Sequence, residues 1–215
     1  MRIKVCGMTR IEQVHALDEM GIQFAGFNFY HKSPRFVMKH LTGEQLKKAR
    51  VKINKVGVFV NASFDEVMNH VHNYGLHMVQ LHGDETPRFC ERISEQVPTI
   101  KVFRIKEADN IEWKIREYGN VCDVFLFDTD WANYGGSGKK FDWRILDEVN
   151  IDKPFLLSGG IGLEDADKLK EFCQGKNGEK LFAVDINSRF ETSAGVKDLE
   201  KVKAFIQALD SNEEG

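Results

Sequence analysis

Two residues with proton-transfer chemistry stand at the ends of apolar segments. Cys6 ends the run Ile3-Lys4-Val5, and Asp128 ends a second apolar run that starts at Asp123. The carboxyl ends of parallel strands meet at one edge, so a thiol and a carboxyl group far apart in sequence can face each other there. Such a pair suits general acid–base catalysis. Each residue also has a structural alternative, because a buried cysteine packs like a small apolar residue and an aspartate after a strand caps turns.

The next two apolar segments end in residues typical of phosphate sites. They are followed by Gly159 and Gly160, and by a stretch that contains Asp185, Ser188 and Arg189. Backbone N–H groups at such turns bind phosphate, and the loops after strands seven and eight of a barrel are the usual place. Simple turn formation is the alternative for the glycine pair. Both glycine fingerprints for nucleotides, G-x-G-x-x-G and the P-loop, are absent.

Eight apolar segments that read as strands alternate with amphipathic segments that read as helices. The predicted strands begin near residues 3, 24, 54, 78, 99, 123, 154 and 181. The repeat of about 25 residues predicts a single-domain (β/α)8 barrel over residues 1–209. An open doubly wound sheet, which usually has fewer strands, is the alternative. The acidic residues 210–215 are expected to form a disordered tail.

Helix boundaries are predicted from capping residues. A hydroxyl side chain three residues before Glu or Gln, or just before Pro, starts a helix, and glycine ends one. Gly21 and Gly75 are the expected ends of two helices, and residues 143–149 are expected to form a short helix. The predicted starts are Thr9 with Glu12, Thr42 with Gln45, Ser63 with Glu66, and Thr86 ahead of Pro87.

Composition excludes several classes of partner. The formal net charge is −3 with the two signs interspersed, so neither nucleic acid nor an anionic membrane is an expected partner. No apolar run approaches the roughly 20 residues of a membrane span. The four cysteines are scattered and form no C-x-x-C pair, which fits a reducing, cytoplasmic location without disulfides. His82 and Asp84 alone do not complete a metal-ligand set, so no metal is expected.

Read together, these segments resemble one known family, phosphoribosylanthranilate isomerase, a (β/α)8-barrel enzyme of tryptophan biosynthesis. The similarity runs in order along the chain. It includes Lys4-Val5-Cys6-Gly7-Met8-Thr9, Lys32-Ser33-Pro34-Arg35, Val79-Gln80-Leu81-His82-Gly83-Asp84-Glu85, Phe127-Asp128-Thr129, Gly135-Gly136-Ser137-Gly138-Lys139 and Leu157-Ser158-Gly159-Gly160.

The resemblance implies an Amadori rearrangement of N-(5'-phosphoribosyl)anthranilate without metal or cofactor. Asp128 would protonate the furanose ring oxygen, and Cys6 as thiolate would remove the C2' proton. Arg35, on a loop stiffened by proline, would hold the anthranilate carboxylate; a solvated surface arginine is the alternative. The other expected substrate contacts are His82, Gly159, Gly160, Asp185, Ser188 and Arg189. The expected partner is a phosphorylated small molecule, and the expected assembly is a monomer or homodimer.

One position departs from the family pattern. Arg189 stands where a glycine is usual near the phosphate, within Asp185-Ile186-Asn187-Ser188-Arg189. We expect an ordinary helical turn there, capped by Asn187 and Ser188, with the guanidinium adding a partly screened charge to the phosphate site. Two other functions stay open at this point. One is a phosphosugar epimerase, which needs metal ligands, and the other is a barrel that binds a phosphorylated ligand without turnover.

Overall fold

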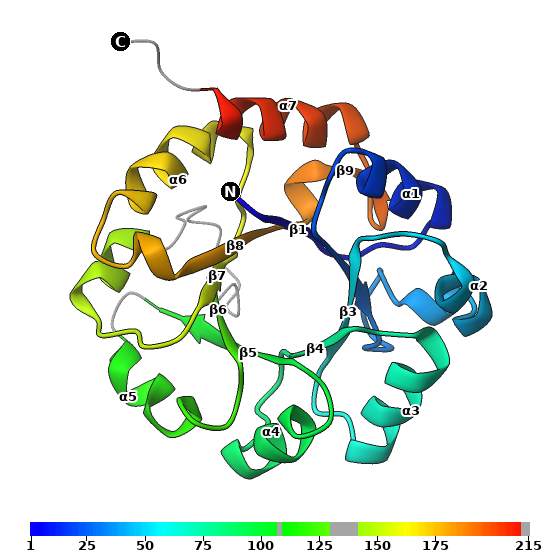
Figure 1. Cartoon of the computed structure of the whole chain (residues 1–215), viewed down its shortest axis with the longest axis horizontal. Coiled ribbons are helices and arrows are strands. Elements are labelled where there is room, and N and C mark those ends of the chain that lie inside the picture. The colour runs from blue at the N-terminus through cyan, green and yellow to red at the C-terminus, as the bar shows by residue number, and fades with distance from the viewer. Residues whose placement is uncertain (107–108, 130–141, 212–215) are drawn as a thin grey trace.

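Eight parallel strands close into a barrel. The computed structural model describes the chain apart from residues 107–108, 130–141 and 212–215. Each strand pairs with the next, and β1 closes on β8 with Lys4 opposite Asp185, which confirms the (β/α)8 prediction and rules out the open sheet (Figure 1). The strands are β1 Ile3–Val5, β2 Phe24–Asn28, β3 Asn54–Phe59, β4 Met78–Leu81, β5 Thr99–Ile105, β6 Val124–Thr129, β7 Phe155–Leu157 and β8 Leu181–Ile186.

The α-helices form a ring outside the strands, in which the first and last helices lie side by side (Figure 1). They are α1 Ile11–Glu19, α2 Gly43–Lys48, α3 Phe64–Tyr74, α4 Pro87–Ser94, α5 Ile111–Ile115, α6 Ala166–Cys173 and α7 Leu199–Asp210. Helix α7 therefore includes Asp210, and residues 212–215 of the expected tail lie outside the described residues.

Shorter elements fill the connections. The helix expected over residues 143–149 is a 3-10 helix, Trp143–Glu148, and the glycine-rich segment before it lies outside the described residues. A small antiparallel pair, β9 Glu191–Ser193 and β10 Val196–Lys197, follows β8 and was not predicted. The other 3-10 helices are Val37–Lys39, Arg116–Tyr118, Leu163–Asp165, Gly178–Lys180 and Ser188–Phe190.

Strand residues alternate between two apolar regions. One set fills the barrel interior, and the other packs between the strands and the helices. The interior set is Phe24, Val56, Ile100, Val102, Val124, Leu126, Leu156 and Ala183. By the same alternation, Lys4 and Gln80 point into the barrel although both are polar, and both are buried. These two residues introduce polarity directly beneath the carboxyl ends of the strands.

Three of the four predicted helix starts are confirmed. Thr42, Ser63 and Thr86 each accept a hydrogen bond from the backbone N–H three residues on. The prediction for Thr9 is wrong, because α1 begins after Arg10 without a side-chain cap. Thr9 Oγ1 instead donates to the carbonyl of Gly195, so this hydroxyl ties the start of the chain to the loop between β9 and β10.

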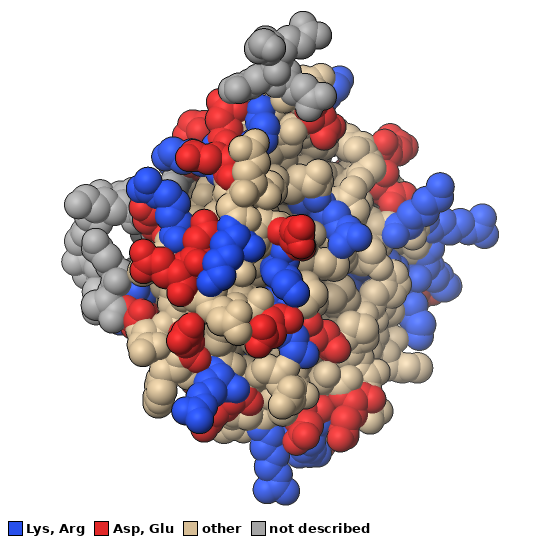
Figure 2. Space-filling model, turned by 60° about the vertical axis from the view of Figure 1, so that its left-hand side comes forward, with Lys and Arg blue, Asp and Glu red and all other residues tan. Residues whose placement is uncertain are grey.

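The described surface carries mixed charge. Figure 2 shows Lys and Arg side chains beside Asp and Glu side chains over most of the face that it displays. Across the described part of the chain, no helix combines the length and the apolar character needed to cross a membrane.

The conformation of Gly21 generates a stability prediction. Gly21 ends α1 with φ +77°, and a Cβ there would meet no atom within 4 Å. Gly21→Ala should therefore lower the free energy of unfolding by about 1–2 kcal/mol through backbone conformation alone. Gly119 is the matched control, because it has φ −57° and similar open space. Gly119→Ala should be neutral or stabilise by up to about 1 kcal/mol in urea unfolding. Equal effects of the two changes would show that the positive φ of Gly21 is not what makes its substitution costly.

Candidate active site

The predicted site residues meet at the carboxyl ends of the strands. Inward-facing residues there include Cys6 after β1, His82 after β4, Asp128 in β6 and Asp185 in β8. A pocket of about 200 Å³ opens between the β6, β7 and β8 ends. It is lined by Asp128, Ser158, Gly159, Gly160, Ile161, Asp185, Asn187, Ser188 and Arg189.

Cys6 lies over Gly26 of the neighbouring strand. A Cβ at Gly26 would come within 2.8 Å of Cys6 Sγ and 3.2 Å of Lys4 Nζ, so the thiol and the ammonium share the space that this glycine leaves. Burial raises the pKa of Cys6, and the positive charge of Lys4 opposes that shift. The thiol is thus buried beside a cation, which is the kind of neighbour that favours a thiolate.

Lys4 pairs with Asp185 across the seam of the barrel. Its Nζ lies 2.9 Å from Asp185 Oδ1, and the lysine side chain has no exposed surface. Burial opposes its charge, but the Asp185 carboxylate and the Cys6 sulfur attract the ammonium, so the pKa of Lys4 lies above its ordinary value. Lys4 was not among the site residues predicted from the sequence. Its position could have been noticed in the sequence, because Lys4 lies two residues before Cys6 in an apolar strand. This spacing puts both side chains on one face of the strand.

Asp128 contacts a histidine. Its Oδ2 lies 3.3 Å from Nε2 of His82, and Nδ1 of the same ring lies 3.1 Å from Nε2 of Gln80. The backbone N–H of His82 donates to the carbonyl of Phe59, which fixes the end of β4 against β3. An imidazole that contacts a carboxyl group can exchange a proton with it, so this pair fits acid–base chemistry.

Arg35 is brought to the mouth from the loop after β2. Its Nε lies 2.9 and 3.1 Å from the two carboxylate oxygens of Glu191, and Nη2 also donates to this carboxylate. The side chain lies against Gly7, where a Cβ would come within 2.4 Å of Arg35 Cδ. Glu191 occupies the Nε–Nη2 edge, so a ligand carboxylate would meet the edge formed by Nη1 and Nη2.

Glu191 also binds a buried lysine. Its Oε1 lies 2.7 Å from Nζ of Lys197, and both side chains are almost completely buried. Burial disfavours the charge of Glu191, but hydrogen bonds from Arg35 and Lys197 outweigh it and lower the pKa of this carboxyl group. The sequence analysis missed this network, because Glu191 and Lys197 lie beyond β8 in the hairpin that it did not predict.

The loops after β7 and β8 carry the residues for which phosphate binding was predicted. Gly159 and Gly160 have φ of +97° and +72°, which residues with side chains rarely adopt. Arg189 lies in the 3-10 helix Ser188–Phe190, and among the described residues Asn61 is the one non-glycine with positive φ. The expected ordinary turn at Arg189 is confirmed.

The expected cap of that turn is wrong. Asn187 makes no side-chain cap, and its Oδ1 instead accepts a hydrogen bond from Lys197 Nζ at 2.8 Å. The guanidinium of Arg189 pairs with Glu164, and both side chains are about half exposed. The charge that Arg189 adds to this rim is therefore partly compensated within the protein.

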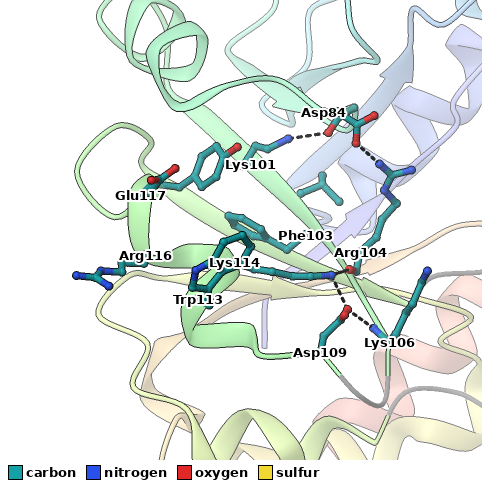
Figure 3. Close-up of a pocket in the computed structure, with 13 residues that line it drawn as sticks. Asp84, Lys101, Phe103, Arg104, Lys106, Asp109, Trp113, Lys114, Arg116 and Glu117 are labelled. Atoms are coloured by element: carbon teal, nitrogen blue, oxygen red, sulfur yellow. Dashed lines mark hydrogen bonds and ion pairs between the residues drawn. The ribbon is translucent and has the colours of Figure 1, made fainter.

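A larger pocket of about 830 Å³ lies against β5 and α5 and shares no lining residue with the smaller one (Figure 3). Two ion pairs lie in its lining, Arg104 with Asp84 and Lys114 with Asp109. Within the described ranges, no cluster of three or more His, Cys, Asp or Glu is suited to hold a metal ion. The smaller pocket is the candidate active site because six of the predicted site residues line it, whereas Cys6, Arg35 and His82 are not among its lining residues.

The closed barrel with polar residues at the carboxyl ends of its strands is the architecture of a (β/α)8-barrel enzyme. Residues 3–208 match the family model described as N-(5'-phosphoribosyl)anthranilate isomerase. A relative of that name from Parabacteroides distasonis is 41% identical over 97% of this chain and 93% of its own. The chain belongs to the N-(5'-phosphoribosyl)anthranilate isomerase family and is an isomerase.

Solved structures agree with this family. The phosphoribosyl anthranilate isomerase of Thermotoga maritima matches with a TM-score of 0.80 and 30% identity over 97% of this chain and 98% of that one. Another solved structure shows a phosphoribosyl anthranilate isomerase in complex with reduced 1-(o-carboxyphenylamino)-1-deoxyribulose 5-phosphate. It matches with a TM-score of 0.77 and 28% identity, again over 97% and 98% of the two chains.

The Glu191 network generates a prediction about pH. Because the folded protein lowers the pKa of Glu191, this residue contributes stability above about pH 4.3, its unfolded value, and loses it as pH falls through the folded value. Glu191→Gln should cost about 3–5 kcal/mol at pH 7 by leaving Lys197 without its carboxylate. The difference from wild type should shrink in urea unfolding at pH 3.

Glu44 is the matched control for that experiment, because it pairs with Lys48 on the exposed surface. Glu44→Gln should change stability by less than about 1 kcal/mol at either pH. A Glu191→Gln variant with wild-type stability at pH 7 would contradict the account of this network.

Proposed function

We propose that this chain catalyses the Amadori rearrangement of N-(5'-phosphoribosyl)anthranilate to 1-(2-carboxyphenylamino)-1-deoxyribulose 5-phosphate in tryptophan biosynthesis. Cys6 is the general base and Asp128 is the general acid. The proposal rests on family membership together with one observation, a single barrel mouth that holds a thiol beside an ammonium and a carboxyl group beside an imidazole. The relative solved with the reduced product analogue supports this substrate class.

The first proton transfer opens the sugar ring. Asp128 protonates the furanose oxygen, the C1'–O bond breaks, and the anthranilate nitrogen forms a Schiff base with C1'. The carboxyl group of Asp128 faces the pocket at the end of β6 and contacts His82. General acid catalysis by a group so placed typically contributes about 100- to 10,000-fold to rate.

The second proton transfer needs a thiolate. Cys6 removes the C2' proton to give the enolamine, which tautomerises to the ketone. A free thiol has a pKa of about 8.5, so most of it is protonated at neutral pH. Burial raises the pKa of Cys6 further, while Lys4 and Lys197 oppose that shift through their positive charges. We infer that these two ammonium groups favour the small thiolate population that reacts.

The two ends of the substrate have separate sites. Backbone N–H groups at Gly159, Gly160 and Ser188 are suited to the phosphate, and Arg189 stands on the same rim. The free edge of Arg35, which Glu191 holds in place, is suited to the anthranilate carboxylate. Binding at both ends would orient C1' and C2' of the sugar toward the acid and the base.

Two substitutions test the assigned roles. Cys6→Ser and Asp128→Asn should each lower kcat by about 100-fold or more, because each removes one proton-transfer group. Cys173→Ser and Asp167→Asn are matched controls, since both residues are exposed and lie on α6. Turnover is measured with purified protein, and circular dichroism checks folding. A variant of Cys6 or Asp128 with near-wild-type kcat would remove that residue from the mechanism.

Growth of a tryptophan auxotroph that lacks this isomerase tests the reaction as a whole. Rescue by the wild-type chain, together with product formation in vitro, is the expected result. A barrel that binds the phosphorylated ligand without turnover would give neither growth nor product. That result would contradict the proposed isomerase activity.

The rim arginine generates a prediction about substrate affinity. Arg189→Met should raise KM about two- to threefold at low salt, because one partly screened charge near phosphate is lost. The difference should shrink as ionic strength rises. Arg144 is a matched control, since it pairs with Asp142 on the exposed surface away from this pocket. If the KM of Arg189→Met equals that of Arg144→Met at all salt concentrations, Arg189 does not contribute to substrate binding.

A further inference from the structure

Gln80 completes a line of three polar side chains that ends at the general acid. Gln80 and His82 are two positions apart on β4, so they face the same side of the barrel wall. Gln80 Nε2 lies 3.1 Å from His82 Nδ1, and His82 Nε2 lies 3.3 Å from Asp128 Oδ2. We refer to Gln80, His82 and Asp128 as the polar triad.

The amide of Gln80 is buried but incompletely satisfied. The residue is 1% exposed, and its Oε1 has no hydrogen-bond partner among the described residues. Turning the amide by 180° would place Oε1 against the imidazole and leave the NH2 group in the unpartnered position. In either orientation, one end of the amide contacts His82 and the other end has no partner. Hydrogen bonds from the surrounding protein therefore do not fix which way the amide points.

Each orientation of the Gln80 amide is compatible with a different protonation state of the His82–Asp128 pair. With the NH2 group facing the ring, Nδ1 accepts, and Nε2–H donates to an Asp128 carboxylate. With the carbonyl facing the ring, Nδ1–H donates, and one further proton lies between Nε2 and Asp128. The second form holds the proton that a general acid transfers, and the first is what remains after the transfer.

We propose that Gln80 is a positioning residue that sets the tautomer of His82 and thereby the proton held by Asp128. The amide turns between its two orientations as the pair loses and regains this proton. His82 has 29% of its side chain exposed, so solvent can return the proton through the ring. The inference rests on the proposed function of Asp128.

Other charged groups face the triad. Arg104 lies opposite Asp128 in the β5–β6 register and pairs with Asp84. Asp185 lines the same pocket as Asp128 and pairs with Lys4. Asp84 and Asp185 thus each have a cationic partner, Arg104 and Lys4 respectively. Their charges are present in every variant described below, so a difference between variants reports the Gln80–His82 contact.

Two substitutions separate the two orientations. The ionised side chain of Gln80→Glu offers acceptors alone, so it should favour Nδ1–H and move the basic limb of the kcat profile up by about one pH unit. Gln80→Met removes the contact and should lower kcat by about tenfold, less than the loss on removing the acid itself, with KM little changed. The same Gln80→Glu change made in a His82→Gln background should leave the profile unmoved, because the ring that transmits it is gone.

A spectroscopic measurement tests the triad without turnover. The ¹⁵N chemical shifts of the His82 ring, assigned by the signals lost in His82→Gln, report which nitrogen carries the proton. We expect Gln80→Glu to enrich the Nδ1–H form relative to wild type, and Gln80→Met to change the tautomer ratio. Unchanged ring shifts in both folded variants would overturn the inference even if the enzyme is active. Changed shifts in a chain without isomerase activity would uphold the triad and reject the proposed function.

Discussion

The structure depends on the seam at which the first and last strands close the barrel. Lys4 in β1 lies opposite Asp185 in β8, and their side chains form an ion pair inside the wall. A buried ion pair is weak evidence for net stability, because desolvation offsets much of the attraction. Its clearer consequence is local, since it holds an ammonium group beside Cys6 at the mouth. The seam that closes the barrel and the surroundings of the Cys6 thiol therefore share one contact.

A second buried network links the chain beyond β8 to the loop after β2. Glu191 binds Arg35 and Lys197, and Lys197 also donates to Asn187. The cationic groups surround one carboxylate, so each has a fixed position before any ligand arrives. The hairpin of β9 and β10 supplies both Glu191 and Lys197. This small element, rather than the barrel itself, sets which edge of the Arg35 guanidinium is occupied by Glu191.

The polar residues at the mouth lie on a layered apolar interior. Phe24, Val56 and Leu126 fill the barrel below, while Lys4 and Gln80 form the transition to the polar mouth. Because these two side chains are buried, their hydrogen bonds are strong and costly to leave unmade. Under the proposed function, Lys4 would act on Cys6 and Gln80 would act on Asp128 through His82, both from beneath the mouth.

Alternating apolar and amphipathic segments in the sequence determined the barrel, since strand and helix periodicity and local caps such as Thr42 and Thr86 depend on neighbouring residues. The ends of the strands likewise identified Cys6, Asp128 and the Gly159–Gly160 turn as mouth residues. Only the tertiary structure decided their partners. Thr9 bonds to Gly195, Arg35 to Glu191, and Gln80 to His82 and through it to Asp128. Most of these contacts join residues that the fold brings together from distant parts of the chain, which no local pattern encodes.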